Sequence, residues 1–171
     1  MTINTKTLAA IDIGTNAIRL FISNVEEYPT ETLFKKIAFL RVPIRLGEDV
    51  FTTGEIGQQK GKRLCETMQG FSYIMSAFNV ESYKAYATCA IREARNGKSV
   101  AEQIQKECDL NIEIISGTKE AETIFAGGMN EVVDDDKTYL YVDVGGGSTE
   151  VIVYSKSVKV EACSFPLGTV R

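Results

Sequence analysis

Two segments with the same pattern lie near opposite ends of the 171-residue chain and align without a gap. They read "LAAIDIGTNAIRLFIS" and "YLYVDVGGGSTEVIVY", and the alignment places Asp12 on Asp143 and Gly14 on Gly145. In each segment an apolar run ends at Asp-x-Gly, a short turn follows, and apolar residues resume with the alternation of a strand. The repeat predicts two β-hairpins, each with a carboxylate at its mouth, so the fold must use this hairpin twice.

The two turns differ from the better-known phosphate-binding loops. Neither carries the Gly-Lys-Ser/Thr of a Walker loop, and neither leads into a helix as a dinucleotide fingerprint does. Consecutive glycines let a backbone bend sharply or approach a ligand closely, although Asp-x-Gly also makes ordinary tight hairpins. One copy alone favours the ordinary hairpin, whereas two matched copies favour an anion site in the turns themselves.

In this interpretation the two hairpin mouths face each other across a ligand. Free backbone N–H groups and side-chain donors would bind phosphate oxygens, and a hydrated Mg²⁺ would lie between Asp12 and Asp143. The predicted side-chain donors are Thr15, Asn16, Ser148 and Thr149.

The segment between the hairpins predicts an α/β domain with a mixed sheet flanked by helices. The expected elements after the first hairpin are a strand up to Pro43, a loop at 45–57, a helix from Ile56 to about Asn79, a strand at 82–90, a helix at 99–109, a strand at 111–116 and a helix at 117–129. The order βββαβαβα is that of a ribonuclease H-like or actin-like ATPase domain.

Signals at the ends of these elements set the expected boundaries. Ser99 and Glu102 match a capping box at a helix start, and Gly127-Gly128 is expected to end the last helix. The polar connection "NEVVDDDKT" predicts a domain boundary near residue 130. Residues 1–129 would then form a complete domain, and residues 130–171 the first strands of a second similar domain that lacks its helices.

Composition narrows the chemistry. The chain has no histidine, so any general base must be a carboxylate, and the net charge of −4 argues against binding of nucleic-acid polymers or anionic membranes. The start lacks a signal-peptide pattern and no run approaches the roughly 18 apolar residues of a membrane span, so we expect a cytoplasmic protein. The cysteines lack a Cys-x-x-Cys pair and indicate buried, reduced thiols at Cys65, Cys89, Cys108 and Cys163.

Four segments together resemble a known family: "AIDIGTNAIRL", "ATCAIREARN", "IEIISGTKEAETIF" and "VDVGGGSTE". The chain is similar to the N-terminal part of the exopolyphosphatase/guanosine pentaphosphate phosphohydrolase (Ppx/GppA) family, which lies within the sugar kinase, Hsp70 and actin superfamily. The similarity runs from Ala9 to the closing "FPLGTVR", with the motifs in the family's order.

The resemblance implies that the hairpins are the phosphate loops of two domains facing each other across a cleft. It implies that Glu120 is the catalytic glutamate and that Arg92 contacts phosphate. Without it, Glu120 would be explained by the helix dipole, and Arg92 and Arg95 as surface charges. The family often has a second glutamate where this chain has Lys119. Lys119 could offer a positive charge to the substrate, but we expect it to point to solvent. The implied phosphate-binding residues are Gly14, Thr15, Asn16, Gly145, Gly146, Gly147, Ser148 and Thr149, with Asp12 and Asp143 at the metal.

The activity implied by the resemblance is that of an exopolyphosphatase. It would hydrolyse the terminal phosphate of inorganic polyphosphate with Mg²⁺, and Glu120 would activate the water. Guanosine pentaphosphate is an alternative substrate, because it presents the same terminal anhydride. A phosphate- or nucleotide-binding module, or an actin-like assembly subunit, would use the same loops without turnover. Strands that lack their helices also predict association of the chain, for example into a homodimer.

Overall fold

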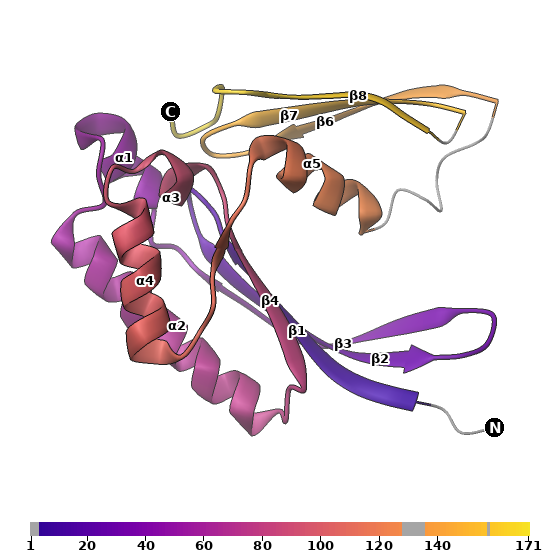
Figure 1. The fold of residues 1–171 in the computed structure, drawn as a ribbon, viewed down its shortest axis with the longest axis horizontal. Coiled ribbons are helices and arrows are strands. Elements are labelled where there is room, and N and C mark those ends of the chain that lie inside the picture. The colour runs from indigo at the N-terminus through magenta and orange to yellow at the C-terminus, as the bar shows by residue number, and fades with distance from the viewer. Residues whose placement is uncertain (1–3, 128–135, 157) are drawn as a thin grey trace.

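The computed structural model describes residues 4–127, 136–156 and 158–171, and its strands form two sheets (Figure 1). The larger sheet has the order β3-β2-β1-β4-β5, in which the first three strands are antiparallel and β4 and β5 run parallel to β1. The smaller sheet is antiparallel, with the order β6-β7-β8. The strands are β1 Asn4–Ile13, β2 Ile18–Glu27, β3 Thr32–Val42, β4 Ser82–Ala87, β5 Glu113–Ile114, β6 Thr138–Val144, β7 Thr149–Ser155 and β8 Val158–Phe165.

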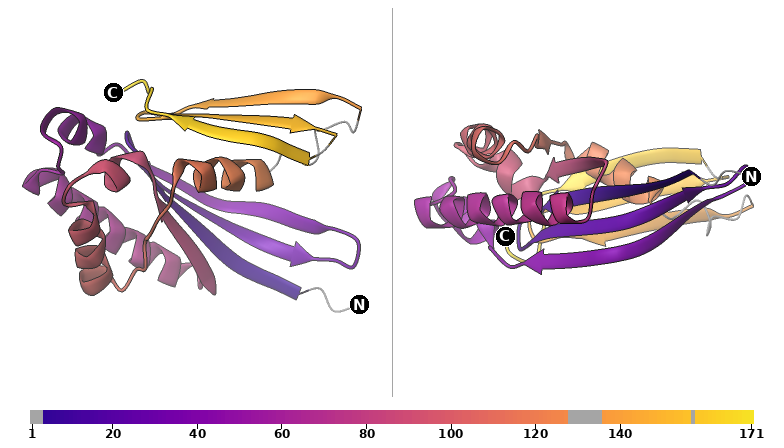
Figure 2. Two further views of the ribbon diagram at one scale, coloured as in Figure 1. Left: turned by 45° about the horizontal axis from the view of Figure 1, so that its top comes forward. Right: turned by 90° about the horizontal axis from the view of Figure 1, so that it is seen from below.

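Five helices complete the described fold: α1 Leu46–Thr53, α2 Gln58–Ala77, α3 Cys89–Glu93, α4 Gly97–Cys108 and α5 Gly117–Ala126. The apolar stripes of α2 and α4 pack on one face of the larger sheet, where the alternate residues Ile11, Ile13, Leu20 and Ile22 are buried. The opposite face of that sheet is not covered in this way, and it faces α5 and the smaller sheet (Figure 1 and Figure 2). The predicted mixed α/β fold of ribonuclease H-like order is confirmed.

Two short helices were not predicted. The expected loop at 45–57 contains α1, whose buried residues Leu46 and Val50 lie one turn apart, and the long helix begins at Gln58 rather than Ile56. The five-residue α3 follows β4 directly, where the sequence indicated only the end of a strand. The last predicted strand of the first domain shrinks to the two residues of β5.

The predicted capping box at Ser99 is wrong, because α4 begins two residues earlier. Its N-cap is Asn96, whose side chain makes no capping bond and instead exchanges two 2.9 Å hydrogen bonds with the backbone of Ile56. Gly97 opens the helix against the carbonyl oxygen of Ile91, only 1.9 Å from where a Cβ would lie. A tertiary contact and a close backbone approach therefore place this helix start, rather than a local cap.

The helix α5 packs against β7 and β8 and covers one face of the smaller sheet. Ala121, Ile152 and Tyr154 form a second, small core there. The other face is open, as the large exposed fractions of Leu140, Val142 and Val144 show. Gly127 follows the end of α5, whereas Gly128 and the predicted boundary near residue 130 lie outside the described residues. Among the described residues, no helix is both long and apolar enough to cross a bilayer.

Candidate active site

The two hairpins repeat each other in structure as they do in sequence. Asp12 pairs with Arg19 across the first hairpin, and Asp143 pairs with Glu150 at the matching positions of the second. The turn at 14–17, named here the first turn, is closed by a 3.2 Å hydrogen bond from the Gly14 N–H to the Ala17 carbonyl. The turn at 145–148, the second turn, is closed by the matching bond from Gly145 to Ser148, at 2.9 Å.

The two turns lie in direct contact. A Cβ on Gly146 would lie 3.0 Å from the Cβ of Thr15, and one on Gly147 would lie 2.9 Å from the Thr15 hydroxyl and 2.5 Å from the Cys89 sulfur. Thr15 and Ser148 are both buried. Glycine is needed in the second turn because the first turn and α3 leave no room for a side chain.

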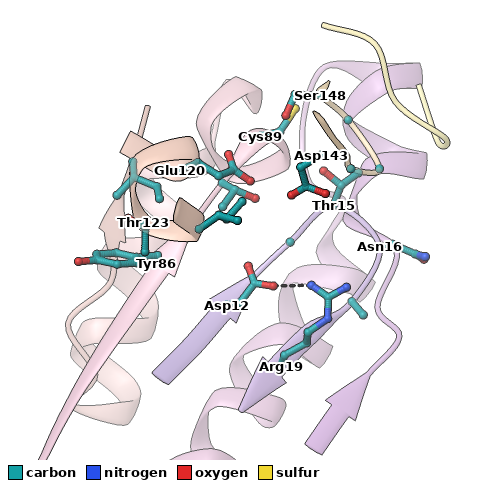
Figure 3. Close-up of a pocket in the computed structure, with 18 of the residues that line it drawn as sticks. Asp12, Thr15, Asn16, Arg19, Tyr86, Cys89, Glu120, Thr123, Asp143 and Ser148 are labelled. Carbon is teal, nitrogen blue, oxygen red and sulfur yellow. Dashed lines mark hydrogen bonds and ion pairs between the residues drawn. The ribbon is translucent and has the colours of Figure 1, made fainter. Parts of the chain in front are cut away.

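A cavity of about 770 Å³ opens beside the two turns. Asp12, Asp143 and Glu120 reach it from β1, β6 and α5, and their carboxylates extend toward the same part of it, whereas the Asn16 side chain points away (Figure 3). The other predicted residues at its wall are Gly14, Thr15, Asn16, Gly145, Gly146, Gly147 and Ser148. Thr149 is not at the wall, and its hydroxyl donates to the carbonyl of Leu167 at 2.7 Å.

Glu120 stands in the first turn of α5 and is mostly buried. Its Oε2 atom is fully buried and makes no hydrogen bond to the described residues, although the Arg92 guanidinium lies 3.5 Å away. Burial, and then the charge of Glu150, raise the pKa of Glu120 to about 7, while Arg92 opposes this. A carboxyl with that pKa can accept a proton from water near neutral pH.

Arg92 does not reach the cavity in which phosphate is expected to bind. Its guanidinium donates to the Ile115 carbonyl at 2.8 Å, pairs with Glu120, and is absent from the cavity wall. Its contact with phosphate therefore stays a prediction. Arg95 lies outside the cavity and bonds to the Thr53 carbonyl, and Lys119 is exposed, as expected.

Two charged residues of the site escaped the sequence reasoning. The Arg19 guanidinium binds Asp12 at 2.5 Å and lines the cavity. Burial raises the pKa of Asp12, Arg19 lowers it, and the charge of Asp143 raises it further, so the two aspartates are electrostatically coupled. Glu150 is fully buried and accepts a 2.8 Å hydrogen bond from Ser164. The alignment of the two hairpins could have revealed both residues, because a four-residue turn places Arg19 directly opposite Asp12 and Glu150 directly opposite Asp143.

These carboxylates suit a hard divalent cation, which prefers oxygen ligands. Among the described residues no group of three acidic, Cys or His side chains forms a ready-made metal cage. Magnesium commonly keeps several waters and binds through one or two carboxylates and substrate phosphates, so Asp12 and Asp143 fit such a site. Glu120 lines the same cavity, and its Oε2 atom makes no hydrogen bond to the described residues.

The cavity continues from the turns along the open face of the larger sheet. Phe21 pairs with Phe39 across β2 and β3, and Tyr86 pairs with Asp12 across β4 and β1. All three aromatic rings line the cavity with Lys84, and Phe39 is 56% exposed. The cavity therefore joins the two turns to an aromatic wall.

Comparisons with known proteins extend this description. The sequence profile of the Ppx/GppA phosphatase family matches residues 12–171. The bifunctional 3-dehydroquinate synthase/phosphatase of Fusobacterium nucleatum is 32% identical over 167 residues, which are 95% of this chain and 25% of that protein. Exopolyphosphatase 1 of Mycobacterium tuberculosis is 27% identical over 169 residues, or 96% of this chain and 47% of that protein.

The fold agrees with solved structures of the same family. An exopolyphosphatase from Cytophaga hutchinsonii matches with a TM-score of 0.84 at 29% identity, over 95% of this chain and 51% of that one. The Aquifex aeolicus member of the Ppx/GppA family matches with a TM-score of 0.82 at 27% identity, over 98% and 53%. The chain spans about half the length of these structures and of the mycobacterial protein. It belongs to the Ppx/GppA phosphatase family.

Proposed function

We propose that this chain carries the phosphate-binding and water-activating part of an exopolyphosphatase, which removes the terminal phosphate of inorganic polyphosphate. The observation that carries the proposal is Glu120, a buried carboxyl with a pKa of about 7 at the wall of a cavity made by two matched glycine turns. Family relatives named exopolyphosphatase support the substrate class. The protein would act in the cytoplasm.

The proposed roles follow from position. Backbone N–H groups of the two turns, with Thr15 and Ser148, would bind the terminal phosphate, and Glu120 would accept a proton from the attacking water. Mg²⁺ bound through Asp12 and Asp143 would neutralise charge on the phosphate oxygens. Arg19 would hold the Asp12 carboxylate in place by its 2.5 Å contact.

Phosphate release from polyphosphate during a Mg²⁺ titration tests these roles. Asp12→Asn and Asp143→Asn should both raise the Mg²⁺ concentration needed for half-maximal rate, because both carboxylates would serve one ion. Lys119→Gln, at an exposed position of α5, should leave the titration unchanged. A shift in only one of the two aspartate variants would show that the hairpins do not serve one metal.

The aromatic wall favours guanosine pentaphosphate as a second candidate substrate. A nucleobase can stack on exposed aromatic rings. In sites for single-stranded nucleic acids, such stacking contributes about 1–3 kcal/mol of binding free energy for each base. Phe39→Ala should then weaken hydrolysis of guanosine pentaphosphate and leave polyphosphate hydrolysis unchanged. Equal effects on both substrates would remove the wall as the reason to prefer a nucleotide. A binding module without turnover is disfavoured, because it has no need of a carboxyl like Glu120.

We further propose that chains of this length associate, as a homodimer, through the open face of the smaller sheet. Its exposed residues Leu140, Val142 and Val144 form one apolar row on β6. An exposed apolar face favours contact with another chain. The edge strands of the smaller sheet add backbone groups that can pair with another strand.

A further inference from the structure

The segment after β8 runs back along the second turn. The N–H groups of Thr169 and Val170 donate to the carbonyls of Gly145 and Gly146, at 3.1 and 2.8 Å. Gly168 lies so close that a Cβ there would be 2.3 Å from the Gly146 oxygen. The backbone at 168–170 and the second turn therefore form one packed unit.

Arg171 links this unit to two helices, α3 and α1. Its guanidinium binds the Glu93 carboxylate at the end of α3 and lies over the Phe51 ring of α1, with its Cζ atom 4.5 Å from the ring centroid. Glu93 in turn accepts a 3.2 Å hydrogen bond from the thiol of Cys89. An arginine that pairs and stacks at once is fixed in position and direction.

The same residues surround the second turn on its other side. A Cβ on Gly147 would meet the Phe51 ring at 2.6 Å and the Cys89 sulfur at 2.5 Å. The contacts thus form a closed path, from Glu93 through Arg171 and the backbone of Val170 to the second turn, and back through Cys89 to α3.

We propose that Arg171 is a positioning residue, which holds the second turn against the first by binding Glu93 and stacking on Phe51. This inference rests on the proposed function, because it explains how two turns from separate hairpins keep the spacing that one phosphate needs. Arg171 does not line the cavity and acts only through the second turn.

The Cys89 thiol provides a readout that needs no catalysis. It is buried beneath the second turn and Arg171, so release of that turn should expose it to N-ethylmaleimide. Burial and Glu93 raise the pKa of Cys89 to about 11, whereas the positive charge of Arg171 lowers it. Loss of that charge alone would slow alkylation, because the thiolate is the reactive form. Faster alkylation in a charge-removing variant can therefore come only from exposure.

The first experiment measures alkylation of each cysteine by peptide mass spectrometry. Arg171→Gln should speed alkylation of Cys89 about three- to tenfold. This factor corresponds to the stabilisation that a partly exposed ion pair with a cation–π contact contributes. Cys65 and Cys108, buried in the core of the larger sheet, should keep their rates. Arg95→Gln is the matched control for charge loss outside the cavity. An unchanged Cys89, or equal acceleration at all three buried thiols, would overturn the proposal.

The second experiment measures the affinity of the same variants for inorganic tripolyphosphate by calorimetry. Arg171→Gln should weaken binding, and Arg171→Lys, which keeps the charge but not the planar stack, should recover part of the loss. Unchanged affinity with an exposed Cys89 would overturn the positioning role. If the unaltered chain binds no tripolyphosphate, the proposed function fails, and the thiol rates still decide whether Arg171 holds the turn.

Discussion

Glu120 is the residue on which the proposed chemistry depends, and its environment has a cost in stability. Burial raises its folded pKa from 4.5 to about 7, so the protonated form is the one that the folded state favours. The stabilising contribution of the protonated carboxyl is complete below the unfolded pKa and is lost as the pH rises through the folded pKa. At neutral pH and above, the fold therefore holds a partly desolvated charge that a neutral side chain would avoid.

Glu120→Gln should therefore stabilise the chain at high pH. We expect an increase in the free energy of unfolding of about 1–3 kcal/mol near pH 8, and little change near pH 4, where Glu120 is already neutral. Urea denaturation at the two pH values measures it. The exposed Glu66→Gln, on α2, is the control and should show no such difference. A Glu120 variant that is more destabilised at pH 8 than at pH 4 would mean that the carboxylate, and not the acid, suits the folded site.

The sequence revealed one member of each charged pair at the hairpin mouths. Asp12 and Asp143 were found because Asp-x-Gly marks a strand end, whereas Arg19 and Glu150 sit inside apolar runs and look like ordinary outward positions. Only the register makes them partners, since each lies opposite its aspartate. Cys163 was expected to be buried and is exposed, because the open face of the smaller sheet carries it.

At the scale of elements, the period of the apolar residues predicted the hairpins, α2, α4 and α5. The misses are the short helices α1 and α3, whose eight and five residues give too little periodicity. The start of α4 was misplaced because Asn96 bonds to Ile56, 40 residues away in the sequence, and because Gly97 packs against the backbone of Ile91 in the preceding helix. Tertiary contacts of this kind leave no local pattern.

The second turn provides the prediction at this scale. Gly147→Ala places a methyl group against Cys89, Phe51 and Thr15, and overpacking of this kind typically costs about 1–3 kcal/mol. We expect that loss in thermal unfolding, together with weaker binding of tripolyphosphate. Gly70→Ala is the matched control, because no atom lies within 4 Å of its added Cβ. Gly70 lies in the interior of α2, where alanine stabilises a helix relative to glycine. Equal tolerance of both changes would contradict the tight contact between the turns.

At the scale of the whole molecule, the open face of the smaller sheet decides how the chain behaves in solution. Val142→Lys should reduce concentration-dependent association, measured by sedimentation velocity, without lowering stability, because this side chain is 50% exposed. Thr138→Lys, at the polar start of β6, is the control. A chain that remains monomeric at high concentration would remove the proposed homodimer. The domain division near residue 130 stays a prediction.

In the proposed mechanism, two matched turns hold a phosphate beside a carboxyl that activates water. The most direct measurement is the rate of phosphate release from polyphosphate against pH, for the protein that carries this chain and for its Glu120→Gln variant. The rate should rise with pH through about 7, as Glu120 loses its proton, and the variant should be slower by about 10²- to 10⁴-fold. A variant that keeps more than about a tenth of the rate, or an unchanged pH profile, would contradict the claim.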